Sequence, residues 1–309
     1  MNFFQILIVL IILSGCTSNQ EVSNQVEPLN STKFLKKNNL EKKFDYKPEA
    51  PVNGKLYATI EIGSSGLNYF IVNMDSQNRW TLVKSGFGES ALIEGEVDID
   101  AIFLKIESYK RNIIKAGVPK NNIYVIASSS AIALRKIQEI KARLSISGIK
   151  LRRINAMQEG YYDLLATVPK EFIDESFLVD IGSGNTKITW VSNTDTTSLE
   201  TLGSKYYIND VQDTTVFRTV RDILIDIPEK NRTLCFLLGG IPYEFAAATN
   251  KKQGRYTILE APSKYSPSTQ KGKSGKIIYE AIHLNPTFSY IFDWDANFSI
   301  GYLMSLENR

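Results

Sequence analysis

The sequence predicts an α/β fold in which two similar halves face each other across a cleft. Two segments of the same design support this prediction, at residues 56–72 and 177–191. Each has an apolar strand, an acidic residue near its end (Glu61 or Asp180), a glycine-rich turn and a second strand. Two spaced copies of one unit indicate an internal duplication. A third glycine turn follows the apolar strand that begins at Leu234.

The first half, residues 54–170, alternates strands with amphipathic helices. A helix is predicted after Asp98, whose side chain can cap it, because apolar residues from Ile102 to Ile114 recur at helical spacing. Glu159 and Asp163 lie one turn apart on another predicted helix. The strands are expected at residues 57–62, 69–73, 80–84, 124–127 and 150–154, and two further helices at 130–144 and 158–166.

The second half, residues 171–309, repeats this order. The paired strands at its start are followed by a predicted helix at 213–226 and by the strand and turn at 235–240. Residues 261–276 are rich in Ser, Lys, Pro and Gly, which predicts a loop. A final helix is expected at 298–306.

The glycine turns are candidate phosphate-binding loops. A turn with two glycines lets backbone N–H groups approach an anion without obstruction by Cβ atoms. Asp180 and Glu61 could hold a divalent metal ion, through water, beside that anion. A single such turn is more typical of an ordinary β-hairpin, but two copies across one cleft favour anion binding. The candidate phosphate-binding residues are Gly63, Ser64, Ser65, Gly66, Gly182, Ser183, Gly184, Asn185, Thr186, Gly239 and Gly240.

These motifs resemble the actin, sugar kinase and heat-shock ATPase superfamily, which implies duplicated ribonuclease H-like (actin-like ATPase) domains. They are closer to the exopolyphosphatase / guanosine pentaphosphate phosphohydrolase (Ppx/GppA) family. The first loop of that family usually reads Asp-x-Gly-Ser-Asn-Ser, and this chain has Glu-Ile-Gly-Ser-Ser-Gly at residues 61–66. The second loop usually reads Asp-x-Gly-Gly-Gly-Ser-Thr-Glu, and residues 180–187 are Asp-Ile-Gly-Ser-Gly-Asn-Thr-Lys.

The resemblance extends from about residue 56 to about residue 248, because further family segments follow in the same order. It implies Mg²⁺-dependent hydrolysis of phosphoanhydride bonds in polyphosphate or in guanosine penta- or tetraphosphate. It also implies that Glu159 activates the attacking water, whereas by itself Glu159 could be a solvated acid that complements the helix dipole. The additional segments are residues 86–95, 126–135, 154–160 and 198–203.

Two departures from the family pattern bear on catalysis. Lys187 stands where the family has a carboxylate, and a lysine cannot activate water although it could neutralise a phosphate. Glu61 is one methylene longer than the usual Asp. Loss of a general base typically costs about 10²–10⁴ in rate. We therefore carry three hypotheses: a phosphoanhydride hydrolase, which leads; a catalytically degenerate phosphate-, nucleotide- or polyphosphate-binding lipoprotein; and an envelope protein-interaction scaffold.

The N-terminal residues predict a membrane-anchored lipoprotein. Residues 1–13 are almost wholly apolar, which fits the core of a signal peptide over residues 1–15 better than a membrane span. The Leu-Ser-Gly-Cys sequence at 13–16 resembles a bacterial lipoprotein processing site, which would lipidate Cys16. Residues 16–53 would then be a basic tether, which is more typical of a solvated spacer than of a segment that binds anionic lipid. The protein is expected in the cell envelope, at the outer membrane or the periplasmic face. A buried N-terminal helix is the alternative.

The amino-acid composition argues against several classes of functional site. The 36 basic and 33 acidic residues are too balanced for a nucleic-acid surface. A single histidine and two cysteines argue against a histidine-based triad, a zinc site or a disulfide framework. Reactivity must then come from carboxylates, backbone amides and a divalent ion. The expected partners are polyphosphate or a phosphorylated nucleotide, the membrane through Cys16 and a second copy in a homodimer, with no nucleic acid.

Overall fold

The computed structural model describes residues 44–306 except 91, 96, 250, 251, 253 and 284–287. The described residues belong to a single compact unit. The predicted signal peptide and the predicted lipidation site, Cys16, lie outside them. No helix in the described ranges is both long enough and apolar enough to cross a membrane.

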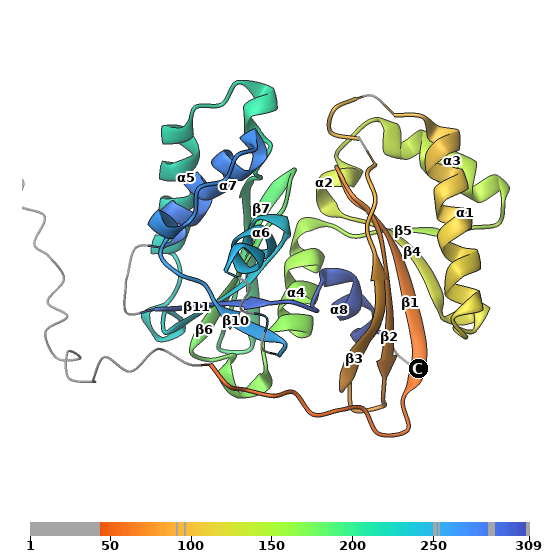
Figure 1. Ribbon diagram of the computed structural model, residues 1–309, viewed down its shortest axis with the longest axis horizontal. Helices are drawn as coiled ribbons and strands as arrows, with labels where there is room; N and C mark the ends of the chain where they lie inside the picture. Colours follow the sequence, from red (N-terminus) through yellow and green to blue (C-terminus); the bar gives the residue numbers. More distant parts are fainter. Residues whose placement is uncertain are drawn as a thin grey trace, which may run out of the picture. The chain divides into compact units, whose positions relative to one another are not determined.

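The first sheet has five strands in the order β3-β2-β1-β4-β5. β1, β2 and β3 form an antiparallel meander, whereas β4 and β5 run parallel to β1. The strands are β1 (Lys55–Ile62), β2 (Leu67–Met74), β3 (Trp80–Gly86), β4 (Ile123–Ala127) and β5 (Leu151–Arg153). One face is covered by α1 (Ile99–Lys115) and α3 (Lys136–Ile146), as Figure 1 shows. The predicted Asp98 cap is confirmed, because its side chain accepts from Ala101 N.

The second sheet repeats this arrangement, which confirms the predicted duplication. Its order is β10-β11-β9-β6-β7-β8, with β6, β7 and β8 antiparallel and with β9 and β11 parallel to β6. An additional strand, β10, pairs antiparallel with β11. The strands are β6 (Ser176–Ile181), β7 (Asn185–Ser192), β8 (Asp195–Leu202), β9 (Leu234–Leu238), β10 (Tyr256–Ile258) and β11 (Ser289–Asp293).

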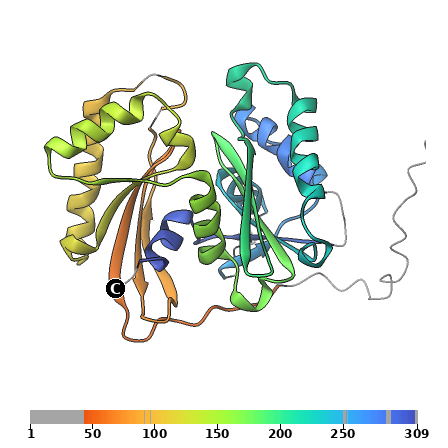
Figure 2. The ribbon, with the colours of Figure 1, turned by 180° about the vertical axis from the view of Figure 1, so that it is seen from behind.

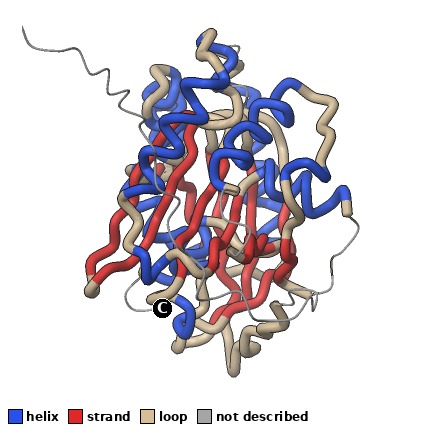
Figure 3. The backbone as a smooth tube through the Cα atoms, turned by 90° about the vertical axis from the view of Figure 1, so that its left-hand side faces the viewer, coloured by secondary structure: helices blue, strands red, loops and turns tan. Residues whose placement is uncertain are grey.

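Three helices pack on one face of the second sheet, and Figure 3 shows the strands of both sheets flanked by helices. They are α5 (Asp213–Ile225), α6 (Gly240–Ala248) and α7 (Gln270–Ile282). Short 3₁₀ turns occupy Lys120–Asn122, Lys170–Phe172, Tyr206–Asn209, Glu229–Asn231 and Pro262–Lys264.

Two helices, α4 (Ala156–Thr167) and α8 (Phe298–Met304), lie between the sheets (Figures 1 and 2). Leu164 of α4 joins the core under β6 and β9, whereas Ala166 joins the core of the first sheet. α8 packs on β1 and β2, although in sequence it belongs to the second half. The last helix of the chain therefore ties the two lobes together.

Three sequence predictions need correction. The helix predicted at 130–144 is interrupted, with α2 (Ser129–Ile132) separate from α3. The loop predicted at 261–276 contains the start of α7, because the small residues of this segment are a packing surface: a Cβ at Gly275 would lie 2.4 Å from Ile241 Cγ1 of α6. The predicted tether includes Phe44, whose ring centroid lies 5.3 Å from those of Phe172 and Tyr256.

Candidate functional site

A cleft of about 880 Å³ is lined by residues of both sheets and by all three glycine turns. This volume is typical of a small-molecule site. The structure thus brings together most of the residues predicted from sequence. Those that line the cleft are Glu61, Gly63, Ser64, Ser65, Gly66, Glu159, Asp180, Gly182, Ser183, Asn185, Gly239 and Gly240.

Two of the predicted phosphate-binding residues, Gly184 and Thr186, lie outside the lining of the cleft. A Cβ on Gly184 would lie 2.7 Å from Ser130 Cβ and 2.8 Å from Ser64 Oγ. Glycine is therefore needed for the second turn to touch the first turn and α2. Thr186 is fully buried, and its Oγ1 has no hydrogen-bond partner among the described residues. Neither residue is among those that line the cleft.

The first and second glycine turns, at residues 63–66 and 182–185, are each hydrogen-bonded to a neighbouring segment of the chain. Ser90 N and Ile93 N donate to the carbonyl oxygens of Ser65 and Ser64, each at 2.8 Å. In the same way, Ser204 N and Lys205 N donate at 2.9 Å to the carbonyl oxygens of Gly182 and Ser183. These turns suit an anion because their carbonyl oxygens are already engaged within the protein.

The third turn requires glycine on two grounds. Gly239 has φ +99°, a conformation that other residues rarely adopt. A Cβ there would also lie 2.3 Å from Ile181 O and 2.8 Å from Asp180 Oδ1. This close approach sets the first residue of α6, Gly240, beside the end of β6. A Cβ on Gly240 would lie 3.3 Å from Lys271 Nζ, so an ammonium group adjoins the turn.

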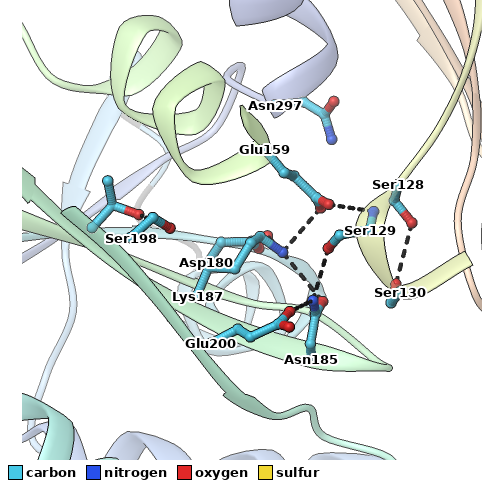
Figure 4. A network of polar contacts seen from close by, with 12 residues as sticks. Ser128, Ser129, Ser130, Glu159, Asp180, Asn185, Lys187, Ser198, Glu200 and Asn297 are labelled. Atoms are coloured by element: carbon cyan, nitrogen blue, oxygen red, sulfur yellow. Dashed lines mark hydrogen bonds and ion pairs between the residues drawn. The ribbon is translucent and has the colours of Figure 1, made fainter. Parts of the chain in front are cut away.

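Lys187 lies at the centre of the polar network (Figure 4). Its side chain is only 1% exposed, and its Nζ lies 2.9 Å from both Glu159 Oε1 and Asp180 Oδ2. Nζ also donates to Asn185 Oδ1 at 3.3 Å. The expectation that Lys187 could neutralise a phosphate needs revision, because this ammonium already neutralises two carboxylates of the protein.

Glu159 is positioned by the start of its own helix and by a hydrogen bond from α2. Asn155 and Gln158 form a capping box that starts α4, so that Glu159 falls in its first turn. Glu159 Oε2 accepts a 2.6 Å hydrogen bond from Ser129 N at the start of α2. Ser129 Oγ in turn accepts from Asn185 Nδ2 at 2.8 Å. Both oxygens of the predicted catalytic carboxylate thus have partners within the protein.

Three carboxylates converge closely enough that one metal ion could contact them all. Oxygens of Glu159, Asp163 and Asp180 lie within 4.8 Å of one another. Sequence reasoning expected Glu61 with Asp180 as the ligands, and it missed Asp163. The one-turn spacing of Glu159 and Asp163 on α4 was the available signal. Glu61 lines the same cleft but is not a member of this cluster.

Burial and neighbouring acids raise the pKa of two carboxyl groups of the site. Burial, followed by the charges of Glu159 and Asp180, raises the pKa of Glu61 to about 8. Burial and Asp180 also raise the pKa of Asp163 well above its ordinary value. Burial alone would lower the pKa of Lys187, but the neighbouring carboxylates outweigh burial and hold it well above the ordinary value. At neutral pH the Lys187 side chain is therefore charged and the Glu61 carboxyl is largely protonated.

Comparisons with known proteins identify the fold. No family model and no curated protein sequence matches this chain. The structure is similar to the crystal structure of the Aquifex aeolicus Ppx/GppA family member, with 17% identity and a TM-score of 0.61 over 81% of this chain and 97% of that chain. It is also similar to an exopolyphosphatase from Cytophaga hutchinsonii, with 11% identity and a TM-score of 0.62 over 82% and 99%. The chain therefore has the two-lobed, actin-like ATPase fold of the Ppx/GppA exopolyphosphatases.

Proposed function

We propose that the protein binds polyphosphate, or a guanosine penta- or tetraphosphate, in the cleft between its two sheets. The observation that carries this proposal is the pair of duplicated glycine turns, at residues 63–66 and 182–185, which meet across one cleft. The ammonium of Lys271 beside the third turn adds a positive charge on the same wall. Backbone amides and a lysine are the groups with which proteins commonly bind phosphates.

In this proposal Mg²⁺ enters the cleft bound to the phosphate compound. Acidic side chains outnumber lysines among the residues that line the cleft, so an uncompensated phosphate chain would be repelled. Polyphosphates in solution carry divalent cations, which offset this repulsion. The acidic residues of the lining are Glu61, Glu89, Glu94, Glu159, Asp180, Glu244, Asp293 and Asp295.

The geometry favours binding over hydrolysis. A general base must accept a proton from water, but Glu159 is paired with the buried ammonium of Lys187. Lys187 Nζ contacts Glu159 Oε1 and Ser129 N donates to Glu159 Oε2, so both oxygens that could accept a proton from water are already engaged. Hydrolysis of the phosphoanhydride is the second candidate function, because Glu159 still lines the cleft that the glycine turns form.

Attachment to the cell envelope through lipidated Cys16 is part of the same proposal. It is supported by the apolar residues 1–13 and by the Leu-Ser-Gly-Cys sequence that ends at Cys16. Incorporation of labelled palmitate into the wild-type protein and into Cys16→Ser, expressed in bacteria, tests it. We expect label in the wild type only; equal labelling of Cys16→Ser would contradict the anchor.

Calorimetric titration of the full-length protein in detergent with polyphosphate and Mg²⁺ tests the binding proposal. Lys271→Ala should weaken binding roughly 10- to 100-fold, because one charge-assisted contact contributes about 1.5–3 kcal/mol. Lys273→Ala is the matched control, since Lys273 is exposed on the same helix and does not line the cleft. No binding by the wild type, or equal losses in both variants, would contradict the proposal.

Phosphate release measured in parallel separates the two candidate functions. We expect binding without release. Release that requires Mg²⁺ and disappears in Glu159→Gln would instead establish the hydrolase, in spite of the ion pair with Lys187.

A further inference from the structure

We propose that the ammonium of Lys187 occupies the cation position of the carboxylate cluster, so that the protein holds no divalent metal ion of its own there. This inference goes beyond the proposed function. It concerns the carboxylates of Glu159, Asp163 and Asp180, and it holds whatever ligand enters the cleft.

The contacts of Lys187 match the donor capacity of an ammonium group. An ammonium has three N–H donors. Nζ has three oxygen partners, namely Glu159 Oε1 and Asp180 Oδ2, both at 2.9 Å, and Asn185 Oδ1 at 3.3 Å. The group is therefore fully coordinated by the protein. Figure 4 shows it pointing from β7 toward the carboxylate of Glu159 on α4.

The sheet fixes this position. Lys187 of β7 lies directly opposite Asp180 of β6 on one side and Glu200 of β8 on the other. Its side chain is 1% exposed, so it cannot move into water without repacking its surroundings. In the family that the sequence resembles, a carboxylate follows the second loop at this position. A lysine there changes the charge of the cluster by two units.

A divalent ion and this ammonium exclude each other. Mg²⁺ binds carboxylate oxygens at roughly 2.1 Å. An ion bound to Glu159 Oε1 or Asp180 Oδ2 would therefore lie within about 5 Å of Nζ, given the 2.9 Å contacts of both oxygens. Like charges at that separation repel strongly in a buried site. The residues present do not fit a resident divalent ion, although three carboxylates converge.

Binding of Mn²⁺ alone, without any phosphate compound, tests the inference by electron paramagnetic resonance on the full-length protein. We expect no saturable site in the wild type. Lys187→Glu, which replaces the ammonium by a fourth carboxylate, should bind one Mn²⁺ at least about 100-fold more tightly than the wild type. Lys205→Met is the control, because it removes a cleft lysine that pairs with Glu94 instead of the cluster, and it should gain no site.

Thermal unfolding with and without Mn²⁺ gives a second measurement. Mn²⁺ should raise the melting temperature of Lys187→Glu and leave that of the wild type unchanged. If Lys187→Glu does not fold, Mn²⁺ binding by the wild-type protein is the test. The absence of bound Mn²⁺ in the wild type supports the inference. One Mn²⁺ bound to the wild type and lost in Asp180→Asn overturns it. Because no phosphate is present, this result is separate from failure of the proposed function.

Discussion

Glu61 is a buried acid whose protonation is coupled to folding. Its side chain lies close to Glu159 and Asp180, and its Oε2 has no hydrogen-bond partner among the described residues. Burial and these acids raise its pKa from 4.5 to about 8. Between these two pH values the folded protein binds a proton that the unfolded chain has released. Stability is therefore lost as the pH rises through this range.

At the residue scale, we predict that Glu61→Gln reduces the decline of the unfolding free energy between pH 5 and pH 8. The decrease in slope should reach up to about 1.4 kcal/mol per pH unit, and the variant should be the more stable protein at pH 8. Urea unfolding at a series of pH values measures both quantities. Glu89→Gln, at an exposed residue of the same lobe, should keep the wild-type slope. An unchanged slope in Glu61→Gln would contradict the assigned pKa.

Helix α4 is the element on which the site depends, and two glycines set its distance from its neighbours. A Cβ on Gly160 of α4 would lie 2.0 Å from Ser198 Oγ of β8. A Cβ on Gly301 of α8 would lie 1.8 Å from Tyr162 O of α4. Backbone atoms cannot yield as a flexible side chain can. Both contacts hold α4 in the place from which Glu159 reaches Lys187 and Ser129.

At the element scale, we predict that Gly301→Ala destabilises the protein by about 2 kcal/mol or more. The gain in helix propensity, about 1 kcal/mol, is smaller than the cost of forcing α8 away from α4. Chemical denaturation of the wild type and the variant measures the difference. Ser305→Ala, at an exposed residue at the end of the same helix, should remain within about 0.5 kcal/mol of the wild type. Equal stability of Gly301→Ala and the wild type would show that the helices can separate without cost.

At the scale of the whole molecule, the two lobes are joined by the side chain of Arg255. Its guanidinium pairs with the fully buried side chain of Asp293 at 2.8 Å and donates to Ala166 O at the end of α4. Its Cζ also lies 4.0 Å from the ring centroid of Trp80 on β3. One side chain thus joins the second sheet to α4 and to the edge of the first sheet.

We predict that Arg255→Met destabilises the whole molecule by about 3–5 kcal/mol, because it leaves the charge of Asp293 buried without its partner. The double variant Arg255→Met/Asp293→Asn should recover part of this loss, since it removes the unpaired charge. Denaturant unfolding of the wild type, the single variants Arg255→Met and Asp293→Asn, and the double variant gives the coupling through a double-mutant cycle. Additive losses in the double variant would mean that the pair contributes no interaction energy.

The sequence alone determined the duplication, the three glycine turns and most of the strands. These features depend on neighbours in the chain: an apolar strand, a glycine that permits a close turn and a capping residue act locally. The same local signals placed Glu159 in the first turn of a helix and predicted that Glu61 and Asp180 stand beside the turns. Lipidation of Cys16 remains a prediction of the sequence, because that residue lies outside the described structure.

Only the tertiary structure decided how the charges are paired. Ser129, Glu159 and Asn185 come from α2, α4 and β7, and they meet only because the two lobes pack together. The residues next to Lys187 in the sequence do not reveal whether its ammonium group contacts a bound phosphate or a carboxylate of the protein. Its burial between Glu159 and Asp180 follows from strand register and from the position of α4. The one-turn spacing on α4 places Asp163 beside Glu159, but only long-range packing brings both of them to Asp180 and returns α8 to the first sheet.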